Sequence, residues 1–123
     1  MIEKFRILLV DVSRLVGEMV EGAVVRTNDM GVVGSTSLDE LLDTARASTP
    51  DVVIVGIDAH NGLPDACLEL LLERPRVKVL AIEEHGGTAR LYELRPERVE
   101  IGDVSPDEVV ESIRAAVLRP TPF

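Results

Sequence analysis

The stretch Asp51-Val52-Val53-Ile54-Val55-Gly56-Ile57 holds four β-branched residues in succession after its opening acid. The run is too short for a helix and is apolar on both faces, so it predicts a strand that is covered on both sides. Strands buried on both faces are typical of parallel sheets with helices on either side. The stretch therefore predicts an α/β fold with this strand near the centre.

Apolar segments before and after this stretch in the sequence predict the other strands of the sheet. Further strands are expected at 5–10, 31–35, 77–82 and 98–101. Strands at such intervals leave room for one helix in each connection, which is the pattern of a parallel sheet.

Helices are expected in each gap, and three of them follow capping residues, with apolar residues at helical spacing behind each cap. Ser13 precedes a stripe formed by Leu15, Val16, Met19, Val20, Ala23 and Val24. Ser37 and Glu40 have the spacing of a capping box ahead of Leu41. The other helices are expected at 65–72, at 88–94 and from Ser105-Pro106 onward. The order strand, helix thus repeats five times within one domain, residues 1–118, followed by a tail at 119–123.

Composition narrows the class of protein. The 123 residues carry a net charge of -9, with 22 acids against 13 bases, which argues against nucleic acid and against an anionic membrane surface as partners. A basic patch on another protein is an easier partner. Cys67 is the only cysteine, which suits a reducing compartment. The apolar run before Asp11 is too short for a signal peptide, so a soluble, cytoplasmic protein is expected.

Three segments, in this order and spacing, resemble the receiver domain of bacterial response regulators. They are Arg6-Ile7-Leu8-Leu9-Val10-Asp11, Pro50-Asp51-Val52-Val53-Ile54-Val55 and Ser105-Pro106-Asp107-Glu108-Val109. They look like that family's first strand with its acidic end, the lead into its third strand and the start of its last helix. The resemblance covers nearly the whole chain. It implies a flavodoxin-like (βα)5 fold: a doubly wound, parallel, five-stranded sheet of order 2-1-3-4-5 with its site at the carboxyl ends of the strands.

The same resemblance implies a set of five side chains for phosphotransfer. Two adjacent acids after the first strand hold Mg²⁺, and an Asp after the third strand accepts the phosphoryl group. A Thr or Ser after the fourth strand and a Lys after the fifth bind the phosphoryl oxygens. The chemistry needs a divalent cation and an ammonium around a carboxylate nucleophile.

This chain keeps one of the five. Asp11 matches one Mg²⁺ acid, and its neighbour is Val12. The phosphoacceptor position falls on Gly56, the hydroxyl position on Glu83 and the lysine position on Gly102. Gly56 supplies no nucleophile, and the Glu83 carboxylate would repel a phosphoryl group. The resemblance therefore implies a pseudo-receiver, in which the fold is kept and phosphotransfer is lost.

Two alternatives use the same loops. Asp58 lies two residues after Gly56 on the same face of the strand, so it is an alternative phosphoacceptor that would work with Asp11 and Mg²⁺. A metal- or ligand-sensing site could draw on Asp11, Asp58, His60, Glu83 and His85, because clustered acids recruit cations and histidines ligate transition metals. No tight ligand spacing supports a metal site, and loop side chains of this kind also simply point to water. No cofactor is expected, with Mg²⁺ required only if Asp58 is the acceptor.

A protein surface is the remaining candidate. In the family, the face made by the fourth helix, the fifth strand and the fifth helix is used for docking and dimerisation, which implies Leu91, Tyr92, Leu94 and Val99 as anchors. The alternative is that these residues complete the core. No nucleophile and base occur at a usable spacing, so an enzyme is not expected. The sequence thus predicts an atypical, non-phosphorylatable signalling domain that binds a protein partner or itself.

Overall fold

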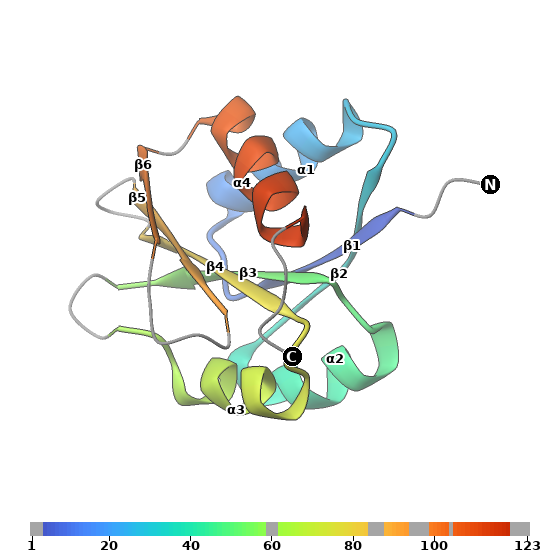
Figure 1. Cartoon of the computed structure of the whole chain (residues 1–123), viewed down its shortest axis with the longest axis vertical. Helices are drawn as coiled ribbons and strands as arrows, with labels where there is room; N and C mark the ends of the chain where they lie inside the picture. The colour runs from blue at the N-terminus through green and yellow to red at the C-terminus, as the bar shows by residue number, and fades with distance from the viewer. Residues whose placement is uncertain (1–3, 59–61, 84–87, 94–98, 104, 119–123) are drawn as a thin grey trace.

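A computed structural model describes residues 4–58, 62–83, 88–93, 99–103 and 105–118, with side chains for all of these except 99–103 and 116–118. Figure 1 shows one sheet between two layers of helices, with α1 and α4 on one face and α2 and α3 on the other. The prediction of an α/β fold is confirmed.

The sheet has six strands among the described residues, in the order β2-β1-β3-β4-β5-β6. Their bounds are Phe5–Val10 (β1), Met30–Thr36 (β2), Val52–Ile57 (β3), Lys78–Glu83 (β4), Thr88–Tyr92 (β5) and Val99–Asp103 (β6). The strands β1 to β4 run parallel, whereas β5 is antiparallel to both β4 and β6. The order 2-1-3-4-5 is therefore present, but the sheet is neither five-stranded nor wholly parallel.

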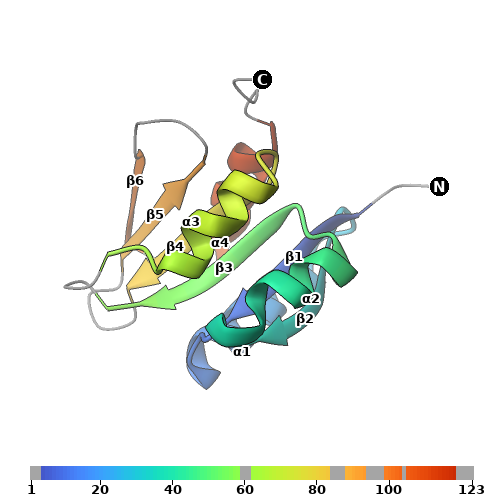
Figure 2. The same cartoon turned by 90° about the horizontal axis from the view of Figure 1, so that it is seen from below.

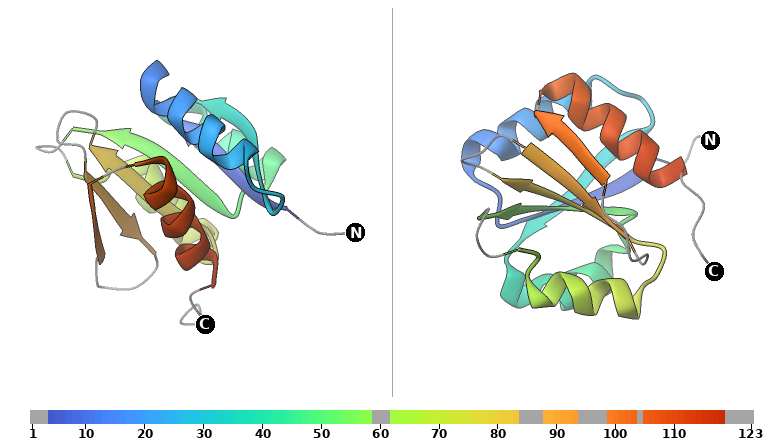
Figure 3. Two further views of the ribbon diagram at one scale, coloured as in Figure 1. Left: turned by 90° about the horizontal axis from the view of Figure 1, so that it is seen from above. Right: turned by 60° about the vertical axis from the view of Figure 1, so that its left-hand side comes forward.

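The helices are α1 (Arg14–Val25), a 3₁₀ turn η1 (Leu38–Glu40), α2 (Leu41–Ser48), α3 (Asp65–Glu73) and α4 (Pro106–Leu118). Figure 2 shows α2 and α3 together on their face, with β5 and β6 at the outer side of the sheet. Figure 3 shows α1 and α4 side by side on the opposite face. Two predicted caps are confirmed: the Val16 amide donates to Ser13 Oγ (3.2 Å), and the Glu108 amide donates to Ser105 Oγ (3.3 Å).

Alternation along β3 divides the core into two layers. Val53, Val55 and Ile57 pack with α2 and α3, whereas Val52 and Ile54 pack with α1 and α4. The quoted stretch is buried on both faces, as its composition predicts. Cys67 belongs to the layer under α3, where burial raises the pKa of its thiol to about 12. This thiol is a small core hydrophobe rather than a nucleophile.

The predicted helix at 88–94 is wrong: residues 88–92 form β5 instead. Ala89 and Leu91 point into the core, while Thr88, Arg90 and Tyr92 are half-buried on the other side. Residues at alternate positions lie on one face of a strand but not on one face of a helix. A strand can therefore bury Ala89 and Leu91 together, and a short helix cannot. The strand predicted at 98–101 is β6, and β5 separates it from β4.

Two local predictions also fail. Leu15 is 77% exposed, because it lies in the first turn of α1 and off the stripe centred on Val20 and Ala23. The capping box at Ser37 does not form, since the Ser37 side chain makes no capping hydrogen bond. The Asp11 carboxylate accepts the Leu38 amide hydrogen instead, at 3.0 Å.

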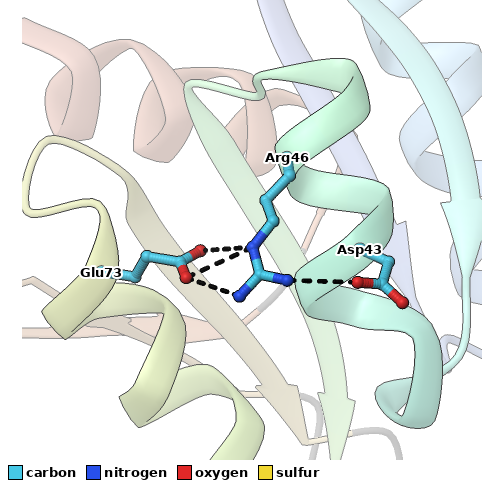
Figure 4. A network of polar contacts seen from close by, with 3 residues as sticks. All are labelled: Asp43, Arg46 and Glu73. Atoms are coloured by element: carbon cyan, nitrogen blue, oxygen red, sulfur yellow. Dashed lines mark hydrogen bonds and ion pairs between the residues drawn. The ribbon is translucent and has the colours of Figure 1, made fainter.

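The α2/α3 layer is held at its surface by Arg46. Figure 4 shows the Arg46 guanidinium between Asp43 on its own helix and Glu73 on α3, with the shortest contact at 2.6 Å to Glu73 Oε1. Hydrogen bonds from the Arg46 guanidinium, and then its charge, hold the pKa of Glu73 below its usual value. The pair fixes the end of α3 against α2.

No helix in the described ranges is both long enough and apolar enough to cross a bilayer.

Candidate functional site

The carboxyl ends of β1, β3, β4 and β6 share one edge of the sheet, and the predicted site positions lie there. Gly56 is opposite Ile82, and Gly102 is opposite Ala89, so both glycines lie in the same row across the sheet. Glu83 lies in the next row, opposite Ile57 on one side and Thr88 on the other. The fold thus brings the predicted positions to one edge of the sheet.

Asp11 is committed to backbone hydrogen bonding at this edge. Its backbone has φ 46°, a left-handed conformation that Asp tolerates better than most residues, and its amide donates to the Thr36 carbonyl (3.0 Å). Its Oδ2 holds the Leu38 amide, which starts η1. The adjacent Val12 packs against the core beside α1. The first strand therefore ends in one carboxylate with a structural role, not in a pair of metal-binding acids.

Gly56 offers no side chain, and the described residue Glu83 does not replace one. Alternation along β3 puts position 56 on the α1/α4 face, whereas Glu83 is in register with Ile57 on the α2/α3 face. Asp58 is exposed just beyond the strand end. The Glu83 carboxylate and a side chain at position 56 would therefore lie on opposite faces of the sheet.

Glu83 is buried, and its carboxylate is bound by two side chains of β5. Oε1 lies 2.6 Å from Arg90 Nη1, and Oε2 accepts a hydrogen bond from Thr88 Oγ1 at 2.9 Å. A buried carboxylate needs such partners, because an uncompensated charge in the interior is costly. The Glu83–Arg90–Thr88 cluster thus forms a charge-neutralised, hydrogen-bonded network at the carboxyl end of β4.

The residues that sequence reasoning missed are Thr88 and Arg90. They were assigned to a helix, where neither would face Glu83. The signal was present as strict alternation of Thr88, Arg90 and Tyr92 with apolar Ala89 and Leu91, after the turn-forming pair Gly86-Gly87. An antiparallel hairpin from β4 explains both features.

The insertion of β5 also moves position 102. Neighbouring strands lie about 4.8 Å apart, so Gly102 on β6 is three spacings, about 14 Å, from β3 instead of two. A lysine at this position would need to reach across an additional strand. Position 102 is therefore farther from β3 than the resemblance implies.

The structure describes some of the remaining predicted residues and not others. His60, His85 and Leu94 lie outside the described residues, as does the tail at 119–123. Within the described ranges, Asp11, Asp58 and Glu83 do not form part of any group of three potential metal ligands. Leu91 is 3% exposed and packs inward, so it is a core residue and not a surface anchor. Tyr92 is half-buried against the α2/α3 layer, and Val99 lies on β6, at the edge of the described sheet.

Comparisons with known proteins do not place the chain in a family. No model of a protein family matches it, and no curated protein matches it significantly.

Proposed function

We propose that this protein is a receiver-like signalling domain that binds a protein partner, or a second copy of itself, without being phosphorylated. The observation that carries the proposal is the Glu83–Arg90–Thr88 cluster. Glu83 occupies the position that the resemblance gives to the phosphoryl-binding Thr or Ser, so that position supplies no free hydroxyl. An acid that is already neutralised by an arginine and hydrogen-bonded by a threonine favours a static structural edge over a reaction site.

The other corners support the same reading. Gly56 supplies no nucleophile, and the Asp11 carboxylate already accepts the Leu38 amide. Phosphoryl transfer depends on positioning and on neutralising charge, so the loss of nucleophile, second acid and lysine together removes its basis. Folds of this kind host many functions, and the proposal therefore stands on these side chains and not on topology alone.

Charge indicates the chemistry of the partner. The chain has a net charge of -9, and its helices expose acids such as Asp39, Asp43, Asp65, Glu69, Asp107 and Glu111. Complementary potentials speed association and disfavour like-charged partners. A basic surface on a protein in the cytoplasm fits these properties best.

Intact-mass spectrometry after incubation with acetyl phosphate and Mg²⁺ tests the proposal. We expect no phosphoryl adduct, whereas a conventional receiver domain treated in parallel gains one. Circular dichroism of the same sample verifies that the protein is folded. Sedimentation equilibrium then separates self-association from the need for a different partner.

The variant Asp58→Asn makes the test decisive. An adduct on the wild-type protein that is lost in Asp58→Asn would overturn the proposal and identify Asp58 as a phosphoacceptor acting with Asp11 and Mg²⁺. An adduct that persists in the variant would also overturn it, and would locate the acceptor elsewhere.

A further inference from the structure

A cleft lies at the amino edge of the sheet, opposite the edge just described. It is formed by residues 49–51, which lead into β3, and by residues 73–77, which join α3 to β4. Its volume is ≈ 510 Å³. Ligand pockets for small molecules typically measure about 300–1,000 Å³, so the cleft has room for a small metabolite.

The lining combines an apolar surface with two guanidinium groups. Pro50, Pro75 and Val77 supply the apolar part and are buried or half-buried. Arg74 caps the end of α3, and Arg76 follows two residues later. Apolar walls with a few converging polar groups are the usual composition of a small-molecule site.

The two arginines lack acidic partners. Throughout the described part of the chain, no carboxylate lies within 4.0 Å of either guanidinium. The Arg74 Nε is buried and has no hydrogen-bond acceptor. Buried donors are nearly always satisfied in folded proteins, so this nitrogen needs an acceptor that water or a bound ligand can supply.

The acids in the same lining are already engaged. Glu73 is bound by the Arg46 guanidinium at 2.6 Å, and the Asp51 Oδ2 accepts the Arg6 amide hydrogen at 2.8 Å. The end of α3 is also satisfied, since the Arg74 amide donates to the Leu70 carbonyl and the Arg74 carbonyl accepts from the Val77 amide. Arg74 and Arg76 thus form no ion pair with a described residue, and the Arg74 charge acts at longer range on Glu73, where it helps to lower the pKa.

The wider edge is basic although the protein is acidic. Helices in this fold run opposite to the parallel strands, so their carboxyl ends meet here, and cations are favoured at such ends. The basic residues near this edge include Lys4, Arg6, Arg46, Arg74 and Arg76. These side chains can attract an anion, whereas the helix carboxyl ends carry partial negative charge and the acids Asp29, Asp51 and Glu73 lie at the same edge.

We propose that this cleft binds a small organic oxyanion, a carboxylate or phosphate on an apolar body, through Arg74 and Arg76. Guanidinium groups bind both oxyanions in a bidentate, charge-assisted manner. The apolar body packs on Pro50, Pro75 and Val77. This proposal is independent of the proposed function, which concerns the opposite edge.

Titrations followed by ¹H–¹⁵N NMR test this proposal with benzoate and phenyl phosphate as probes. We expect saturable shifts at the amides of 49–51 and 73–77 and at the Arg74 Nε–H. Binding should weaken about tenfold in Arg74→Gln, because a hydrogen bond to a charged group is lost. Arg26→Gln is the matched control, since Arg26 caps the end of α1 and is exposed, away from this cleft. Thermal unfolding of both variants verifies their folds.

The probes also distinguish the ligand class. Tighter binding of benzoate identifies a carboxylate, and tighter binding of phenyl phosphate identifies a phosphate. Shifts that sodium chloride reproduces, no saturation with either organic anion, or equal affinity in Arg74→Gln would each overturn the proposal. Inorganic phosphate that binds as tightly as phenyl phosphate would refute the role of the apolar lining.

Discussion

Replacing Glu93 by Leu is expected to lower the free energy of unfolding by about 3–5 kcal/mol, because it leaves a buried ammonium without its counter-charge. Lys78 Nζ lies 3.0 Å from Glu93 Oε2, and the two side chains are only 3% and 2% exposed. Lys78 begins β4, and Glu93 lies just beyond β5. The pair meets only if β5 runs antiparallel to β4, so its energy reports on the topology as well as on stability.

A double replacement isolates the charge effect. Adding Lys78→Met to Glu93→Leu should restore most of the lost stability, since apolar residues of similar size often replace buried ion pairs without cost. Glu18→Ala is the control, because the Arg14–Glu18 pair has side chains 92% and 62% exposed and should contribute at most about 0.5 kcal/mol. Urea unfolding followed by circular dichroism measures all three. Equal losses for Glu93→Leu and Glu18→Ala would show that the pair is not buried.

Leu91→Ala is expected to cost about 2–5 kcal/mol, because truncating a packed leucine leaves a cavity. Leu91 is 3% exposed in β5 and faces Leu80 across the strand pair. Leu15→Ala is the matched control: Leu15 is 77% exposed, so its truncation should change stability by less than about 0.5 kcal/mol. The same urea unfolding measures both.

The result for Leu91 also separates two roles for that residue. A surface anchor would tolerate alanine with little loss of stability, as Leu15 does. A large loss places Leu91 in the core and removes it from any docking surface.

The elements that could be predicted from sequence are those whose signal is local. The run from Val52 to Val55 is buried on both faces whatever its neighbours, and Ser13 and Ser105 cap helices through bonds within one turn. These features depend on a few adjacent residues, so their patterns indicate them reliably.

The elements that could not be predicted depend on distant partners. The capping box at Ser37 had the correct spacing, but Asp11, remote in sequence, already supplies the acceptor for Leu38. The helix predicted at 88–94 has only a weak helical pattern of apolar residues. Its own alternation of apolar and polar residues favoured a strand, and pairing with β4 decided the matter.

The candidate site shows the same division. Gly56 and Asp11 could be located from the strand ends alone, because a parallel sheet brings those ends to one edge. The role of Glu83 could not, since its partners Arg90 and Thr88 come from a strand whose direction was not foreseen. Which charges neutralise one another at this edge is therefore a consequence of the antiparallel insertion.

That insertion is the central claim, and proton–proton NMR contacts between β4 and β5 test it most directly. Pairs along an antiparallel ladder alternate between wide and narrow spacing, so one of the neighbouring pairs Leu80–Leu91 and Ala81–Arg90 should show a strong contact between its Hα protons. The structure predicts this contact together with extended backbone at 88–92. Strong sequential amide–amide contacts through 88–94, with no Hα contact to β4, would indicate the helix instead and would contradict the account of the edge built on Arg90.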